Sequence, residues 1–186
     1  RLLSILNECY RSGHHPQWDL IQLEAIKCLR EICNNISGIK EFFRHCEAFT
    51  LLAHSLNPAK QVIMLEVVKL MCTFSLPMWQ EHGLDGHREV LNAITVVADF
   101  KKQDRFSPIV LGLGLQNNDP LQLNCMCLIN SLINFVPDDN MYFRIHLRNE
   151  FLRTGLQDVL EILDTSDHIN IKTQLEIFYK YRVEDF

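Results

Sequence analysis

The sequence lacks several patterns that would assign it to a membrane or β-sheet class. No apolar run approaches the roughly 18 residues that a membrane-spanning helix requires, and the chain does not open with a signal peptide. No convincing stretch alternates polar and apolar residues with the period of two that is typical of β-strands. We therefore expect neither a transmembrane segment nor a β-sheet.

Signatures of catalysis are also missing. The chain contains no P-loop, no G-x-S-x-G motif and no H-E-x-x-H motif. Gly112-Leu113-Gly114 lacks the third glycine of a dinucleotide-binding loop. The pairs Asp138-Asp139 and Glu184-Asp185 are more simply interpreted as a helix start and a solvated end than as an acid–base pair. We expect no enzymatic activity and no cofactor.

The eight histidines do not form a metal-binding pattern. The strongest candidates are His14-His15, His45-Cys46, and His82 with His87. None of them shows C-x-x-C or H-x-x-x-H spacing on one helix face, which is the arrangement that would present two ligands together. Surface or loop positions explain these histidines better, and we expect no metal.

Charge and cysteine content point to a protein of a reducing compartment that does not bind nucleic acid. The net charge is −5, and the lysines and arginines are scattered without a basic stripe that could follow a phosphate backbone. The seven cysteines are odd in number, and most lie in apolar helical segments where they serve as small hydrophobic residues. This argument outweighs the single glycosylation sequon, Asn35-Ile36-Ser37.

Apolar residues recur every three or four positions along the whole chain, which predicts an all-α protein. We expect Asp19 to cap the second helix, and Asn117-Asn118-Asp119-Pro120 is a strong helix start. A looser stretch covers 79–86. The expected helices span about 2–11, 19–35, 38–43, 49–56, 61–76, 87–100, 105–115, 121–135, 141–154, 156–163 and 169–181.

Three of these helices resemble one another. Residues 28–34, 70–76 and 128–134 align, and each lies in the longest and most apolar helix of its neighbourhood, at intervals of roughly 40 to 60 residues. This period predicts an armadillo-repeat right-handed superhelix of about four repeats, with residues 1–186 as one domain. An irregular helical bundle is the alternative.

In such a superhelix the long helices stack, and their outer edges form a concave binding face. The expected core positions are Leu29 and Ile32, Met71 and Phe74, and Ile129 and Leu132. The expected groove positions are Lys27 and Glu31, Lys69 and Thr73, and Cys127 and Ser131. Cys127 and Ser131 are small, which suits a closely packed partner helix, although small residues are also needed wherever neighbouring helices cross.

Four segments in order resemble the inhibitory domain of Diaphanous-related formins, of the Dia or DAAM branches. They are 27–40, with its C-L, N-N and G-I pattern; 65–72 followed by 86–95; 104–110 leading to 127–133; and 143–151 with 155–160, ending in Glu184-Asp185-Phe186. The match covers nearly the whole chain.

The resemblance implies an N-terminal regulatory region that holds an actin-assembling protein inactive in the cytoplasm, with actin reached only indirectly. Its concave face binds an autoregulatory helix from the C-terminus of the same protein, through Ser131, where the family usually has Ala, and through Lys69, Thr73, Cys127 and Asn134. A GTP-bound Rho-family GTPase displaces that helix and touches Asn34 and Asn35.

The chain begins without Met and already in helical register, so we expect a piece of a longer protein. The resemblance implies that a small GTPase-binding subdomain before it and a dimerisation region after it are absent. We therefore expect this piece to be monomeric and to bind Rho weakly on its own. The alternative function is a general armadillo adaptor that binds peptide segments of unrelated partners.

Overall fold

The computed structural model describes residues 1–13, 15–136 and 140–185, and these residues form helices and no strand. The elements are α1 (Leu2–Arg11), α2 (Pro16–Ile32), α3 (Ile36–Phe43), α4 (Ala48–His54), α5 (Gln61–Phe74), the 3-10 helix η1 (Pro77–His82), α6 (Gly86–Lys101), α7 (Ser107–Leu113), α8 (Asp119–Asn134), α9 (Met141–Phe151), the π-type turn η3 (Leu152–Leu156), α10 (Gln157–Leu163) and α11 (Ile169–Glu184). The all-α prediction is confirmed. No helix in the described ranges is both long and apolar enough to cross a membrane.

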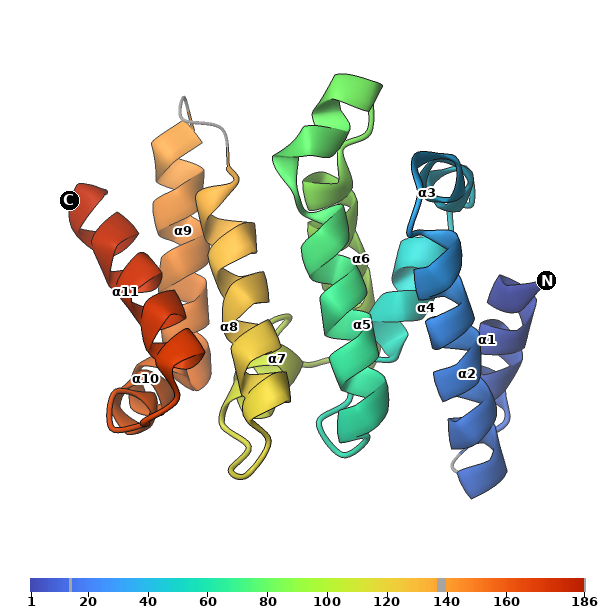
Figure 1. The fold of residues 1–186 in the computed structure, drawn as a ribbon, viewed down its shortest axis with the longest axis horizontal. Coiled ribbons are helices and arrows are strands. Elements are labelled where there is room, and N and C mark those ends of the chain that lie inside the picture. Colours follow the sequence, from blue (N-terminus) through green and yellow to red (C-terminus); the bar gives the residue numbers. More distant parts are fainter. Residues whose placement is uncertain (14, 137–139, 186) are drawn as a thin grey trace.

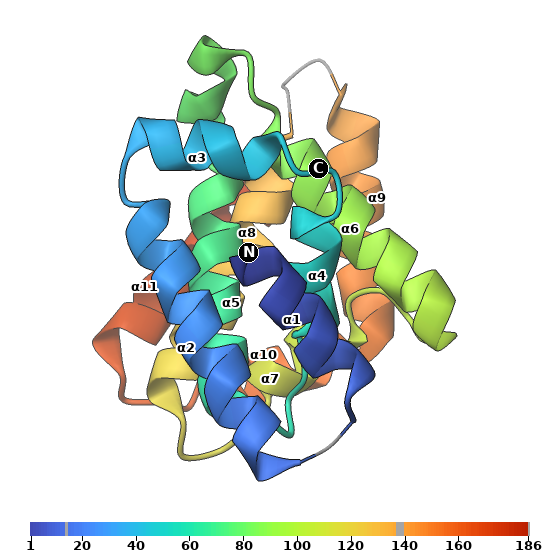
Figure 2. The same cartoon turned by 90° about the vertical axis from the view of Figure 1, so that its right-hand side faces the viewer.

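The helices form four consecutive units, and each unit ends in a long helix: α2, α5, α8 or α11. These four long helices pack against their neighbours in that order, α2 on α5, α5 on α8 and α8 on α11 (Figure 1). Helices α1, α4, α6 and α9 lie behind them in a second layer, and α3 and α10 run from one layer towards the other (Figure 2). The arrangement is the predicted armadillo-like stack, and α11 supplies a fourth long helix that the sequence alignment did not include.

Local sequence signals explain several helix starts. The Asn118 side chain caps α8 by accepting a hydrogen bond from the Leu121 N–H at 3.2 Å, and Pro120 fits the first turn, where no N–H is needed. Asp85 caps α6 in the same way through the Arg88 N–H. The expectation for α2 was wrong. His15 is its cap, and Asp19 lies in the first turn of a helix that already begins at Pro16.

The core is continuous along the stack, as expected for repeats that bury their faces against one another. Five of the six predicted core residues are buried, but Ile32 is 45% exposed and its placement in the core was wrong. Ile32 is the last residue of α2, so its side chain lies at the rim where the chain turns into α3.

The last unit contains the sharpest break in the chain. Gly155 has φ of 101°, a left-handed conformation that glycine adopts at little cost, and it separates α9 from α10 where the sequence predicted two helices. The helix start predicted at Asp138-Asp139 lies outside the described residues. Glu184-Asp185 is not wholly a solvated end, because Asp185 is buried.

Candidate functional site

A groove of about 440 Å³ lies on the face formed by the long helices. Its lining comes from α5, α8, α11 and the residues that follow α5 and α8, and comprises Cys72, Thr73, Leu76, Cys127, Asn130, Ser131, Asn134, Phe135, Gln174, Ile177 and Tyr181. None of these described lining residues is charged. Four predicted groove residues, Thr73, Cys127, Ser131 and Asn134, are therefore brought together, and Ser131 is partly exposed instead of sealed in the core.

The hydroxyl groups at the centre of the groove are already bonded within their own helices. The Ser131 hydroxyl donates to the Cys127 carbonyl at 2.8 Å, and the Thr73 hydroxyl donates to the Lys69 carbonyl at 3.0 Å. Because their donors are satisfied, these side chains present methyl and methylene groups and spare acceptor lone pairs to the groove. The site suits apolar anchors better than a ligand that must accept hydrogen bonds.

Three thiols lie in or beneath the groove, and burial keeps all of them protonated. Burial raises the pKa of Cys72 well above its ordinary value, raises that of Cys125 to about 12, and raises that of Cys127. The Cys72 thiol donates to the Asn124 carbonyl at 3.6 Å. Since the thiolate is the nucleophile, these cysteines serve as small apolar residues and react only slowly at neutral pH.

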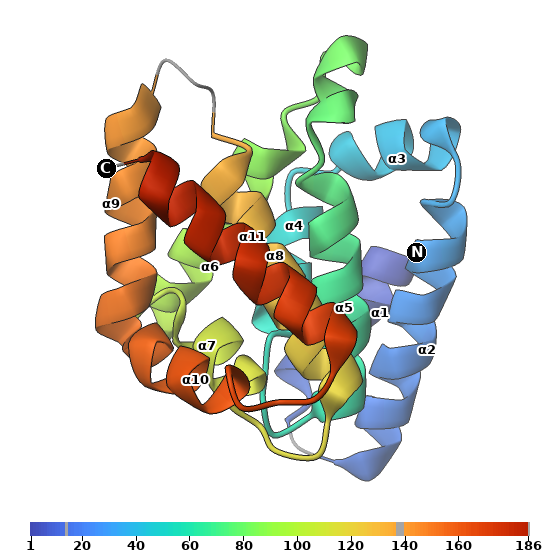
Figure 3. The ribbon, with the colours of Figure 1, turned by 60° about the vertical axis from the view of Figure 1, so that its left-hand side comes forward.

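The sequence reasoning missed the wall that α11 contributes. Gln174, Ile177 and Tyr181 line the groove from this helix. The Gln174 carbonyl and side-chain oxygens accept hydrogen bonds from the Asn130 amide at 2.9 and 3.0 Å, which fixes α11 against α8 (Figure 3). The signal was present, because Ile171, Leu175 and Phe178 mark the buried side of α11, and the lining residues lie beside that side at helical spacing.

Lys69 lies one turn before Thr73 but does not line the groove. Its ammonium pairs with Glu66 at 3.1 Å, and Glu66 also pairs with Arg30 of α2. The Glu66 side chain is mostly buried, so this cluster connects α2 to α5 beside the groove. The structure thus separates Lys69 from the other four predicted residues and places it at the charged margin of the site.

Asn34 and Asn35 lie at the corner between α2 and α3. Asn34 is exposed, whereas the Asn35 side chain is occupied at both ends. Its oxygen accepts from the Gly38 N–H at 2.9 Å, and its nitrogen donates to the Ile32 carbonyl at 3.2 Å. A hollow of about 370 Å³ lies beside this corner, and its lining combines apolar residues of α1, α2 and α3, including the exposed Ile32, with polar and charged ones such as Glu41 and His45.

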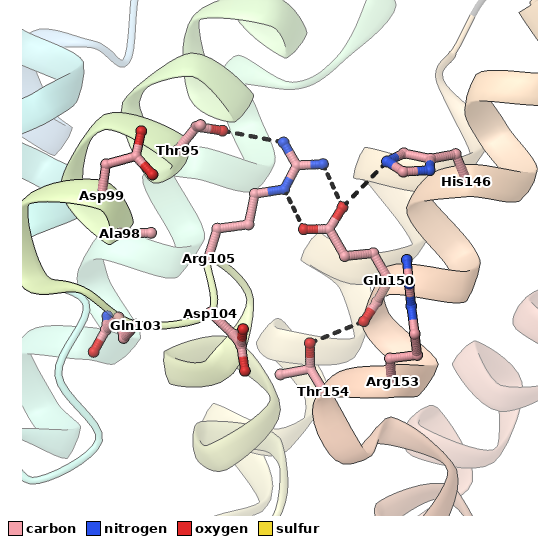
Figure 4. A pocket seen from close by; sticks show the side chains of 10 residues that line it. All are labelled: Thr95, Ala98, Asp99, Gln103, Asp104, Arg105, His146, Glu150, Arg153 and Thr154. Carbon is pink, nitrogen blue, oxygen red and sulfur yellow. Dashed lines mark hydrogen bonds and ion pairs between the residues drawn. The ribbon is translucent and has the colours of Figure 1, made fainter.

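A larger cavity, of about 640 Å³, lies between the third and fourth units, away from the groove. Arg105, just before α7, extends across it to Glu150 of α9 with two hydrogen bonds of 2.7 and 2.6 Å (Figure 4). The same guanidinium donates to Thr95 at 3.1 Å, and its carbon lies 4.7 Å from the centre of the Phe106 ring. Phe106 in turn stacks on Phe151 at 3.8 Å. These contacts hold the third and fourth units together, so the polar residues that line this cavity have a structural role.

Within the described ranges, no three histidine, cysteine, aspartate or glutamate side chains converge as metal ligands would. His14, one member of the histidine pair considered above, lies outside those ranges.

Comparison with known proteins identifies the family. The profile of the Diaphanous FH3 Domain matches residues 87–186, and that of the Diaphanous GTPase-binding Domain matches residues 1–76. The chain belongs to the Diaphanous FH3 family of formins. Protein diaphanous of Drosophila melanogaster is 36% identical over 95% of this chain, and Protein diaphanous homolog 2 of Mus musculus is 36% identical over 88% of it. Disheveled-associated activator of morphogenesis 2 of Gallus gallus is 27% identical over 99%.

The fold is shared with a solved formin. The structure of E. histolytica Formin1 bound to EhRho1-GTPgammaS matches with a TM-score of 0.83 over 99% of this chain and 63% of that chain, at 18% identity. This formin region spans only 14% of the mouse relative and 17% of the fly relative. Within it, the FH3 match contains the α8 and α11 sides of the groove, and the GTPase-binding match contains the α5 side together with Asn34 and Asn35.

Proposed function

We propose that this region is the autoinhibitory part of a cytoplasmic, cytoskeleton-associated formin, and that its groove binds an amphipathic helix from the C-terminal segment of the same protein. The observation that carries the proposal is the uncharged groove lined by α5, α8 and α11. Solvent-exposed faces of stable domains are ordinarily polar, and a groove with small side chains and satisfied hydroxyl groups suits the apolar face of a helix. Actin is then affected only through the full-length protein.

Binding in this groove depends on apolar contact and close approach. Ser131 and Cys127 are small enough for the backbone of a partner helix to pack closely above α8. Leu76, Phe135 and Ile177 offer larger apolar surfaces around them. The charged cluster of Arg30, Glu66 and Lys69 borders this apolar area and restricts where charges of the partner helix can lie.

We further propose that a GTP-bound Rho-family GTPase binds at the α2–α3 corner through Asn34 and Asn35 and releases the helix. Two findings support this: the GTPase-binding profile covers the corner, and the formin of similar fold was solved with EhRho1-GTPgammaS. The Asn34 side chain is exposed and makes no hydrogen bond among the described residues, so Asn34→Asp should test the GTPase contact without destabilising the fold. Asn35→Ala would remove the cap of α3 as well.

Pulldown with the isolated C-terminal half of the same protein tests both proposals. We expect this region to retain the C-terminal half, Ser131→Asp to lose it, and a GTP-loaded Rho protein to release it from the wild type when added at a concentration that saturates the weak GTPase site. Retention by Ser131→Asp would remove the groove from the proposal. Failure of the GTPase to release the complex would remove the second part only. Light scattering should give a mass near 21.7 kDa, and a mass near twice that would contradict the expected monomer.

A further inference from the structure

A charged site lies away from the groove, where α1, α4 and α6 end and α5 begins. It is a cavity of about 550 Å³ whose lining includes Arg11, Lys60 and Lys101, and no carboxylate among the described lining residues. A chain with net charge −5 therefore gathers three cations around one hollow.

Two of these cations lack a counter-charge in the described part of the chain. Lys60 pairs with Asp19 at 2.5 Å, but Lys101 donates only to the His54 carbonyl at 3.2 Å, and Arg11 makes no ion pair there. Burial lowers the pKa of the Lys101 ammonium. Burial, followed by the charge of Lys101, lowers the pKa of His54 to about 4, so this imidazole is neutral at physiological pH. The positive charge of the site comes from the lysines and the arginine.

Helix dipoles explain only part of this clustering. Arg11 and Lys101 lie in the last turns of α1 and α6, where a cation is favourable. Lys60 is the residue before α5, where a cation is unfavourable. The neutral residue Asn57 also lines the cavity, and because its side-chain oxygen accepts from the Ala59 N–H at 3.0 Å, its NH₂ group is left to donate to a ligand.

An exposed aromatic side chain borders the cavity. The rings of His54, Tyr10 and Phe100 form a cluster in which the His54 centroid lies 4.0 Å from that of Tyr10 and 5.7 Å from that of Phe100. Phe100 is 70% exposed, and Lys101 and Lys102 follow it. An exposed Phe beside several cations is the combination by which protein surfaces attach to anionic lipid.

We propose that the cavity lined by Arg11, Lys60 and Lys101 binds a phosphate-bearing ligand, either a soluble phosphorylated polyol or the same group on a lipid. A phosphate group offers several acceptor oxygens and up to two negative charges, which satisfies the donors and offsets the unpaired cations. The volume exceeds what a single inorganic phosphate fills, and the exposed Phe100 lies where it would enter the surface of a membrane that carries the ligand.

The test compares inositol 1,4,5-trisphosphate, measured by calorimetry, with phosphatidylcholine vesicles that contain 5% phosphatidylinositol 4,5-bisphosphate, measured by sedimentation. Lys101→Gln and Arg11→Gln should each weaken binding about fivefold, since one cation near a phosphate contributes about that factor. Lys40→Gln is the matched control, because Lys40 is an exposed cation of α3 outside the cavity. Thermal unfolding of each variant verifies that it remains folded.

Phe100→Ala separates the two sources of the ligand. Loss of vesicle binding with unchanged trisphosphate binding assigns the lipid source, whereas trisphosphate binding by a wild-type protein that does not bind the vesicles assigns the soluble one. The proposal is overturned if neither ligand binds, or if Lys40→Gln weakens binding as much as Lys101→Gln does. Ser131→Asp should leave phosphate binding unchanged, so this result is independent of the groove.

Discussion

Ser131→Asp is the most direct perturbation of the groove. In the free domain Ser131 is partly exposed, so a carboxylate there remains hydrated and the free energy of unfolding should hardly change. When a partner helix covers the groove, the carboxylate loses water, and no described lining residue carries a positive charge to compensate it. An uncompensated charge at such a contact costs about 3 kcal/mol, which corresponds to a roughly 150-fold loss of affinity.

The matched control is Ser131→Ala. The Ser131 hydroxyl donates its hydrogen bond to the Cys127 carbonyl within α8 and is not available to the partner helix. Its removal should therefore change the affinity for the partner by less than about twofold and should not lower the free energy of unfolding. Fluorescence anisotropy with a labelled C-terminal peptide measures both variants. Equal affinity of wild type and Ser131→Asp, or an equal loss in both variants, would refute the claim that an apolar helix covers this residue.

Three further predictions concern stability and access to the groove. Gly38→Ala should lower the free energy of unfolding by roughly 2 to 3 kcal/mol, because a Cβ there would lie 1.7 Å from a backbone oxygen. Gly112→Ala should change it by less than about 1 kcal/mol, since its nearest obstacle is a flexible Met side chain; urea titration of both decides. Burial alone would raise the pKa of Asp185, but hydrogen bonds from two arginines outweigh it and lower that pKa. The stabilisation of the folded state by the Asp185 carboxylate is therefore present above the ordinary pKa of Asp and is lost as the pH falls through the lower folded-state value. Asp185→Asn should lower the free energy of unfolding by about 3 kcal/mol at pH 7, because it leaves the buried Arg148 without its charged partner. A maleimide should modify Cys127 slowly at pH 7, faster as the pH rises, and more slowly again when the C-terminal peptide is bound; equal rates with and without peptide would contradict groove occupancy.

The stack of long helices could be predicted because each repeat carries its own apolar period. The segments around Leu29, Met71 and Ile129 share a pattern, and each is buried at the junction of neighbouring repeats. Once these helices are adjacent, the position of Ser131 beside Thr73 follows from helical geometry alone. The uncharged centre of the groove could therefore be predicted from the sequence.

The features that could not be predicted depend on how side chains pair and where helices end in the folded chain. Lys69 has the right position along α5, but its pairing with Glu66 draws it to the margin of the groove, and that pairing also involves Arg30 of another repeat. Ile32 fits the apolar period of α2 and is exposed because the helix ends there. The α11 wall was missed because that helix does not share the residue pattern of the other three, although it occupies the equivalent place in the stack.

The geometry of the stack constrains how a GTPase could release a bound helix. Neighbouring packed helices lie about 8 to 10 Å apart, so α5, α8 and α11 together span about 20 Å, and a partner helix that crosses them needs about 13 residues at 1.5 Å each. Such a helix stops one repeat short of α2. All four long helices end at the same edge of the molecule, where the chain also turns from α2 into α3 (Figure 1). Asn34 and Asn35 belong to that turn. A GTPase bound at that corner can therefore exclude the helix in two ways. Either the partner segment extends about six more residues to α2 and competes there with the GTPase for the same surface, or the GTPase is large enough to cover part of α5 and clashes with the helix itself. Truncating the partner peptide to its groove-binding core distinguishes these. Displacement that persists with the core peptide requires the overhang, whereas displacement that disappears shows that the extension alone produced the competition.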